Sequence, residues 1–241
     1  MGPLPTMPVI ANLRQAGGIP VQGGVIRDNV LFRSAAPFHI DQSLTDWMSA
    51  AGVGEIFDLR SESEASHFPG FPQTLNHSTR TRIPLLEAAI GNPADMPGLE
   101  EIYLTLVHEH GPVWVRIAEH VAHAERPTLV HCTAGKDRTG VAVALLLLAV
   151  GANRHAVFAD YARSTDELSG AWFSLVTKNA KAQGITLGQR SRELLVGTTI
   201  AGLNTAIESI ERQHGSVVGY LRYYGLSAAD LRSLEQRLVS R

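Results

Sequence analysis

The sequence predicts an α/β fold, in which a central sheet is flanked by helices and the second half of the chain is mostly helical. Three observations predict it. Short apolar runs that end in polar loops alternate with helical patterns through the first half. A buried strand, a glycine-containing loop and an apolar helix follow one another within 126–150. Helical spacing then dominates 152–241, with breaks at Gly184, Gly215 and Gly225.

Strands are predicted where short apolar or β-branched runs end in charged residues, proline or glycine. They are 25–37, 54–61, 78–87 with Pro84 near its end, and 126–132. The stretch 88–98 is rich in proline and glycine and therefore predicts a loop.

Helices are predicted where apolar residues recur every three to four positions. Ser43 is expected to cap a short helix that stops at Gly52. A longer helical block contains Ile102 and Val121 and is interrupted at Gly111–Pro112. The run VAVALLLLAV begins at Val141 and predicts a buried helix.

Composition and charge exclude several classes of protein. A net charge of −2 provides no overall basic field for nucleic acid. The N-terminus lacks a basic stretch followed by an apolar run, and the run 141–150 is too short to span a bilayer. We therefore expect no stable membrane insertion and a protein that is cytoplasmic or secreted without a cleavable signal peptide. The oligomeric state is left open.

The cysteine and histidine content predicts neither a metal nor another cofactor. The single cysteine excludes an intramolecular disulfide and a cysteine-rich zinc site. His120 and His123 could share a helix face, but no third ligand accompanies them.

The segment VHCTAGKDRTG, residues 130–140, contains the only cysteine in the chain. A strand ends there, a loop of small and charged residues follows, and a helix starts near Arg138. Such a loop directs successive backbone N–H groups at one point, behind which lies the positive end of the helix dipole. This arrangement suits a phosphate group. The expected phosphate-binding or substrate-binding residues are Thr133, Ala134, Gly135, Lys136, Asp137 and Arg138.

Cys132 is at the mouth of this cradle, where the same N–H groups would favour a thiolate that attacks phosphorus. The guanidinium fork of Arg138 could pair two phosphate oxygens and hold the charge of the transferring group. The hydroxyl of Thr139 could assist the thiolate as a leaving group. His131 is expected to position the loop, because a thiolate needs no base.

Two other interpretations of the segment fit less well. A buried structural thiol would leave the spacing of Gly135, Arg138 and Thr139 unexplained. A nucleotide-binding loop requires Gly-Lys-Ser/Thr, whereas Asp137 follows Lys136 here.

The string HCTAGKDRTG has the pattern His-Cys-x5-Arg-Ser/Thr and resembles the protein tyrosine phosphatase superfamily. It is most similar to the atypical bacterial branch typified by a mycobacterial phosphatase. Further matches to that branch are LFRS at 31–34, DLRSESE at 58–64, ADYARSTD at 159–166 and GSVVGYLR at 215–222, while NLRQAGG departs from it at Leu13 and Gln15. Because these matches cover almost the whole chain, we expect one phosphatase domain over 1–241.

The resemblance implies a metal-free hydrolase of phosphate monoesters with a phosphocysteine intermediate. Its implied substrates are phosphotyrosine proteins, sometimes phosphoserine or phosphothreonine proteins, and phosphoinositides. Lys136 matches a lysine that lipid phosphatases use for the inositol ring, but Thr133 occupies the place of their second lysine.

Two further functional classes remain as alternatives. One is a catalytically silent phospho-binding module, which the complete set of loop residues disfavours. The other is an arsenate reductase or sulfurtransferase. Reductases of that kind usually require a second cysteine, which this chain lacks.

The general acid has two main candidates under this resemblance, Asp137 in the loop and Glu87, with Asp95 a weaker third. A structural role for Asp137, accepting loop N–H groups or pairing with Arg138, is the alternative.

The resemblance also suggests residues that support or cover the loop. Asp58 and Arg60, with Glu64, are expected beneath it, unless they form a surface ion pair of little energetic value. The helical stretch 164–195 matches a lid over the active site, with a plain amphipathic helix as the alternative.

Overall fold

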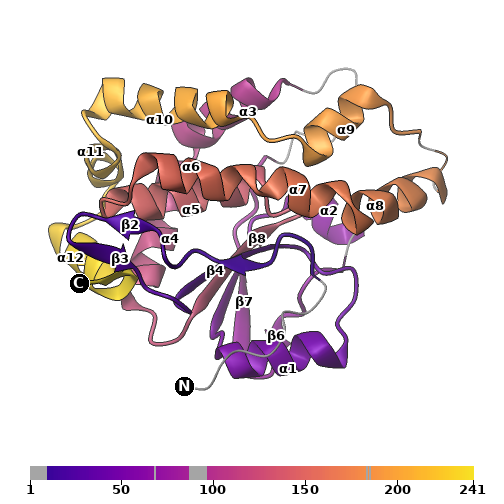
Figure 1. Cartoon of the computed structure of the whole chain (residues 1–241), viewed down its shortest axis with the longest axis horizontal. Coiled ribbons are helices and arrows are strands. Elements are labelled where there is room, and N and C mark those ends of the chain that lie inside the picture. The colour runs from indigo at the N-terminus through magenta and orange to yellow at the C-terminus, as the bar shows by residue number, and fades with distance from the viewer. Residues whose placement is uncertain (1–9, 68, 87–96, 183, 185) are drawn as a thin grey trace.

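The computed structural model describes residues 10–67, 69–86, 97–182, 184 and 186–241. A mixed α/β architecture with a central sheet flanked by helices is confirmed (Figure 1). In the described part of the chain the sheet has the order β1-β4-β8-β5-β7-β6. Its strands, in that order, are Arg14–Gln15, Leu31–Ala35, Thr128–Cys132, Glu55–Asp58, Ser78–Arg82 and Thr74–Leu75.

The four inner strands are parallel, and the short edge strands β1 and β6 pair antiparallel to their neighbours. The carboxyl ends of parallel strands meet at one edge of the sheet, where ligand sites of α/β folds form. Ala35 pairs in register with Cys132, and Asp58 with His131. The register therefore brings three of the sequence-predicted segments together at this edge.

Alternating residues on the strands give the sheet two apolar faces. Phe32, Ile56 and Leu129 pack against α1, Gln42–Ala51. Leu31, Phe57 and Val130 face the larger core, to which the helical second half contributes. Helices therefore cover both faces, as expected for a sheet with parallel inner strands.

Helix α1 begins earlier than the sequence predicts. The carboxylate of Asp41 accepts a hydrogen bond from the backbone N–H of Leu44, so Asp41 is the N-cap in place of Ser43. Both residues are capping types, and the first one reached along the chain holds this position. Gly52 ends the helix in the left-handed region with φ of 68°, as predicted.

The other helices that pack on the larger core flank the sheet or follow it in the chain. They are α3 Leu99–Glu109, α4 Gly111–His123, α5 Asp137–Ala149, α6 Arg154–Ala162, α10 Ile200–His214, α11 Val217–Tyr223 and α12 Ala228–Leu238. The predicted interruption at Gly111–Pro112 is the start of α4, where a proline loses no helical hydrogen bond. Gly215 ends α10 in the left-handed region, as expected from its place after a helical run.

Four further helices lie toward the end of the molecule that holds the carboxyl ends of the parallel strands (Figure 1). They are α2 Glu62–His67, α7 Ser164–Ser169, α8 Ala171–Ala182 and α9 Gln189–Val196. No described helix is both long and apolar enough to cross a membrane.

Two features differ from the sequence-based expectation or fall outside it. A small sheet of β2 Pro20–Val21, β3 Gly24–Ile26 and β9 Val239–Ser240 joins the two ends of the chain. Strands of two or three residues are too short for a hydrophobic pattern to reveal them. The predicted loop 88–98 lies outside the described residues, apart from Pro97 and Gly98.

Candidate active site

The loop from Cys132 to Arg138, here called the catalytic loop, connects β8 to α5 at the carboxyl edge of the sheet. Gly135 has φ of 65°, and a Cβ there would come within 2.1 Å of the Ser34 carbonyl oxygen. Only glycine fits at this position, because both the backbone conformation and the close approach of β4 exclude a side chain. The loop therefore packs directly on the neighbouring strand.

Cys132 is buried at the end of β8 and lines a cavity of about 250 Å³. Thr133, Ala134, Asp137 and Arg138 line the same cavity. The hydroxyl of Thr139 is buried and forms no hydrogen bond with any described residue. The thiol, the guanidinium and the loop are thus brought together as the sequence predicts. Thr139, in the first turn of α5, does not line this cavity.

Glu64 holds the guanidinium of Arg138 from α2. Nη1 and Nη2 of Arg138 donate to the two carboxylate oxygens over 2.5 and 2.6 Å. Thr133 donates its hydroxyl to Glu64 over 2.5 Å. Burial would raise the pKa of Glu64, but the hydrogen bonds and charge of Arg138 outweigh it and lower the pKa to about 2. Glu64 is therefore ionised and fixes the side chain of Arg138.

One edge of the Arg138 fork remains available. Nη1 also donates to the carbonyls of Leu59 and Leu85 over 3.3 Å each, whereas Nε bonds to no described residue. An arginine fork can present Nε and the outer hydrogen of Nη2 to one planar or tetrahedral anion. Arg138 can therefore bind phosphate while Glu64 keeps its hold.

Asp58 and Arg60 form a buried pair, so the alternative of a surface ion pair is wrong. Nε and Nη2 of Arg60 donate to the two oxygens of Asp58 over 2.8 and 2.7 Å, and both side chains are fully buried. Burial raises the pKa of Asp58, but the Arg60 hydrogen bonds outweigh it and hold the pKa at about 2. This pair lies next to His131, whereas Glu64 bonds directly to Arg138.

His131 is a fully buried residue of β8, and its Nε2 is 3.7 Å from Oδ1 of Asp58 in this ion pair. Burial lowers the pKa of His131 to about 4, although the charge of Asp58 acts in the opposite direction. The imidazole is therefore neutral near pH 7, with Nδ1 3.2 Å from the carbonyl oxygen of Cys132. These contacts are those of a side chain that positions the strand end.

Asp137 is the first residue of α5 and is in contact with the cavity. Its Oδ1 accepts a hydrogen bond of 2.6 Å from the hydroxyl of Tyr103 on α3. No hydrogen bond or ion pair joins Asp137 to Arg138 among the described contacts. Pairing with Arg138 is therefore not its structural role. Glu87 and Asp95, the other candidate acids, lie outside the described residues.

The ammonium of Lys136 binds to the end of α9. Nζ donates to the carbonyls of Leu194 and Gly197 over 2.6 Å each, at the C-terminal end of α9. Nζ is also 3.5 Å from Oδ2 of Asp137. A cation at this place satisfies carbonyls that a helix end leaves unpaired. Lys136 thus joins the catalytic loop to α9.

Helices α7 to α9, here called the roof, lie over the catalytic loop. Trp172 of α8 and Ser191, Leu194 and Leu195 of α9 line the same cavity as Cys132. Leu168, Trp172 and Val196 pack with Ala35, and Ala134 of the loop contacts this cluster. The predicted lid segment 164–195 therefore covers the thiol in this structure, and its opening remains a prediction.

Comparison with known proteins identifies the chain. A family model described as "Tyrosine phosphatase family" matches residues 5–240. The chain belongs to the tyrosine phosphatase family. The resemblance inferred from the HCTAGKDRTG string is confirmed, and the enzyme is a phosphatase with a cysteine nucleophile.

Two named relatives agree with this assignment. A Cupriavidus necator protein with the name "Putative tyrosine-protein phosphatase H16_A0669" is 29% identical to this chain. The match covers 88% of this chain and 81% of that protein. The triple specificity protein phosphatase PtpB of Mycobacterium tuberculosis is 37% identical over 48% of this chain and 45% of its own length. The crystal structure of P. aeruginosa TpbA covers 82% of this chain and 91% of its own, with 16% identity and a TM-score of 0.39.

The phosphatase has supporting residues that sequence reasoning did not assign. Asn12 donates its amide to the carbonyls of Ala134 and Gly135 over 3.0 and 2.8 Å. Arg33 donates to the Gly135 carbonyl over 2.9 Å and pairs with Asp160 over 2.9 Å. Arg14 pairs with the same carboxylate over 2.7 Å. These residues lie inside the NLRQAGG, LFRS and ADYARSTD matches, which were the available signal.

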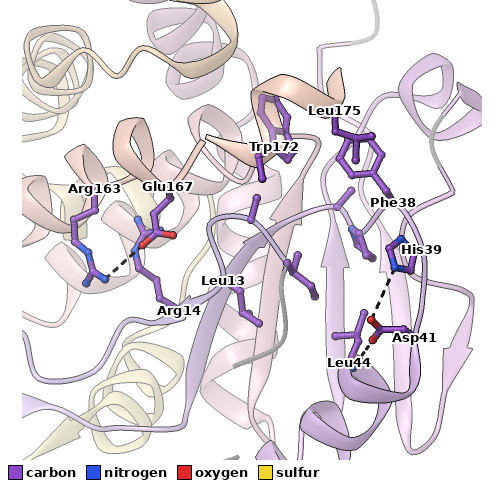
Figure 2. Close-up of a pocket in the computed structure, with 15 residues that line it drawn as sticks. Leu13, Arg14, Phe38, His39, Asp41, Leu44, Arg163, Glu167, Trp172 and Leu175 are labelled. Carbon is purple, nitrogen blue, oxygen red and sulfur yellow. Dashed lines mark hydrogen bonds and ion pairs between the residues drawn. The ribbon is translucent and has the colours of Figure 1, made fainter. Parts of the chain in front are cut away.

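A second cavity, of about 620 Å³, lies beside the roof of the phosphatase (Figure 2). Trp172 lines both cavities, and Leu175 lies above Phe38 on this side (Figure 2). None of the residues from Cys132 to Arg138 lines the second cavity. The catalytic loop therefore opens to the smaller cavity and not to this one.

The described residues contain no group of three or more histidine, cysteine, aspartate or glutamate side chains arranged to hold a metal.

Proposed function

We propose that this phosphatase hydrolyses phosphotyrosine in proteins through a phosphocysteine intermediate on Cys132. One observation carries the proposal most directly: the single thiol is buried in a cavity whose other polar groups include the fixed guanidinium of Arg138. Backbone N–H groups from Thr133 to Arg138 would cradle the phosphate at the start of α5.

In the first step, the thiolate of Cys132 attacks phosphorus and the bond to the leaving oxygen breaks. Arg138 pairs two non-bridging oxygens through its available edge and holds the charge that develops on them. Glu64 acts through Arg138 by fixing its orientation. His131, Asp58 and Arg60 would support the strand that carries the thiol.

Asp137 is the proposed general acid. It would give its proton to the leaving phenolate oxygen and then accept one from the water that attacks the phosphocysteine. Its contact with the cavity supports this role, as does the absence of a described bond to Arg138. Thr139 would donate its unused hydroxyl hydrogen to the sulfur as the S–P bond breaks in the second step.

The cavity walls favour an aromatic phosphate ester. Apart from the loop and Glu64, most of the lining is apolar: Leu86, Leu99, Ile102, Trp172, Leu187, Leu194 and Leu195. An aryl ring can pack against such apolar walls, while the few polar groups at one end hold its phosphate and fix its orientation. A polyphosphorylated ring would need further cations, and Lys136 directs its ammonium at the roof. Phosphotyrosine is therefore the favoured substrate, with phosphoserine, phosphothreonine and phosphoinositides as alternatives.

A substrate panel tests this proposal. A phosphotyrosine peptide, the same peptide with phosphoserine, and soluble phosphoinositides would be compared by kcat/KM on one enzyme preparation. We expect the phosphotyrosine peptide to be preferred, inhibition by vanadate, and no effect of EDTA. We expect Lys136→Ala to change all three activities by similar factors. A selective loss of phosphoinositide hydrolysis, or a preference for that substrate, would contradict the assignment.

A further inference from the structure

A chain of hydrogen bonds connects the N-cap of α10 to Asp137. The backbone N–H of Thr199 donates to the hydroxyl oxygen of Tyr161 over 3.0 Å. The hydroxyl oxygens of Tyr161 and Tyr103 are 2.5 Å apart. Tyr103 then donates to Oδ1 of Asp137 over 2.6 Å. Each group bonds to the next one, and the chain ends at the proposed acid.

The direction of donation along this chain is determined by its ends. A backbone N–H can only donate, and an ionised carboxylate can only accept. Tyr161 therefore accepts from Thr199 and donates to Tyr103, whose own hydrogen points to Asp137. The phenols remain protonated, because burial first, and the charge of Asp137 second, raise the pKa of both Tyr103 and Tyr161.

This direction distinguishes the two oxygens of Asp137. Oδ1 is the acceptor of the single Tyr103 hydrogen, because Tyr103 itself accepts from Tyr161 and has no second hydrogen to give. A proton on Asp137 consequently resides on Oδ2. The ammonium of Lys136, the other described polar contact of this carboxyl, is 3.5 Å from Oδ2 and already donates to two carbonyls.

We infer that Tyr103 is a positioning residue of the phosphatase, which holds Oδ1 of Asp137 so that Oδ2 carries the transferable proton, and that Tyr161 orients Tyr103. This role rests on the proposed function of Asp137 as the general acid. Both tyrosines are nearly fully buried and far from Asp137 in sequence, on α3 and α6. Their hydroxyls act on the reaction only through the carboxyl group.

The leaving-group dependence of kcat/KM tests this role. A general acid matters most when the leaving phenol has a high pKa, and least for nitrophenols, which leave as anions. We expect Tyr103→Phe to reduce kcat/KM about tenfold for phenyl phosphate and to change it little for 2,4-dinitrophenyl phosphate. Asp137→Asn should show the same pattern with a larger loss. The double variant should lose no more than Asp137→Asn alone.

Tyr220→Phe is the matched control. Tyr220 is also buried, and its hydroxyl donates to the Val107 carbonyl over 2.6 Å, away from the catalytic loop. It should lose a comparable amount of thermal stability without any change in leaving-group dependence. Tyr161→Phe, which removes the donor to Tyr103, should change the dependence in the same direction as Tyr103→Phe, and it provides the test if Tyr103→Phe does not fold.

Two results would overturn the positioning role, and they separate it from the role of Asp137. In the first, Asp137→Asn steepens the leaving-group dependence of kcat/KM, while Tyr103→Phe and Tyr161→Phe show the same dependence as the wild type. Asp137 is then the general acid, and the two tyrosines are only structural. If Asp137→Asn itself leaves the dependence unchanged, Asp137 is not the acid, and the role of Tyr103 falls with it.

Discussion

The hydroxyl of Thr139, in the first turn of α5, is buried without a partner among the described residues. Buried polar groups are normally paired, and an exception in a native structure requires an explanation. The sequence places Thr139 seven residues after the sole cysteine, directly after the arginine that would bind phosphate. A hydroxyl that is free in the resting enzyme can donate to a sulfur atom that becomes negatively charged during turnover.

Thr139→Ala should slow the breakdown of the phosphocysteine more than its formation. The change removes no existing hydrogen bond, so we expect a loss of stability of only about 1 kcal/mol. With p-nitrophenyl phosphate, rapid mixing should show a burst of nitrophenol equal to the enzyme concentration, followed by turnover about tenfold slower than in the wild type. An unchanged kcat without a burst would exclude this role for the hydroxyl.

At the scale of elements, hydrogen bonds of one lysine and a small apolar cluster join the catalytic loop to the roof. Lys136 of the loop donates to two carbonyls at the end of α9. A separate bond, from the backbone N–H of Thr198 to the hydroxyl of Thr165 on α7, holds the residues after α9 against the roof itself. Apolar packing of Trp172 and Val196 completes the attachment. Among the described residues of α8, Trp172 is the one buried side chain, so this helix of the roof packs on little other surface.

Lys136→Met should loosen the end of α9 while preserving the length of the buried side chain. We expect amide hydrogen exchange of residues 189–199 to accelerate by at least about tenfold, because two charge-assisted hydrogen bonds of the ammonium disappear. Lys178→Met, which changes an exposed lysine on α8, is the control. It should leave the exchange of residues 189–199 as in the wild type. Equal exchange in both variants would show that Lys136 does not hold the roof.

The sequence predicts those elements that are local and strongly patterned. The strand, loop and helix of 126–150 are continuous in the chain, so the position of Cys132 and Arg138 follows from adjacent residues. The supporting contacts are not local: Arg138 and Glu64 are 74 residues apart, and Asn12 and Gly135 are 123 apart. No periodicity encodes such pairs. The direction of the Lys136 side chain could not be predicted for the same reason.

At the scale of the whole molecule, the sheet buries an ionic layer beneath the active site. Asp58, Arg60 and His131 come from adjacent strands or from the residues that follow them, and all three side chains are fully buried. A second buried group of Arg14, Arg33 and Asp160 connects the sheet edge to α6. Truncating one member of such a group leaves an uncompensated buried charge. A substitution in these groups should therefore lower the stability of the fold and also disturb the geometry of the loop.

Folding stability should decrease when the pH falls from 7 to 5. The pKa of His131 is about 4 in the folded protein against 6.5 in the unfolded chain, so the unfolded state binds the proton first. Its contribution is present above pH 6.5 and is lost as pH falls toward 4, about 2 kcal/mol by pH 5. The lowered pKa values of Asp58 and Glu64 act in the same direction, at more acidic pH.

Urea unfolding at the two pH values measures this difference. His131→Asn, which cannot take up a proton, should reduce the pH dependence even if the variant is less stable at both values. An equal pH dependence in wild type and variant would show that His131 does not titrate in this way.

The account depends most on covalent chemistry at the single thiol. Rapid quenching of the enzyme during turnover of a phosphotyrosine peptide, followed by mass spectrometry, should find one phosphoryl group on the fragment containing Cys132 and none on any other fragment. Cys132→Ser should bind the peptide, form no such adduct and have no measurable turnover. Hydrolysis by Cys132→Ser at a rate near that of the wild type would contradict the mechanism.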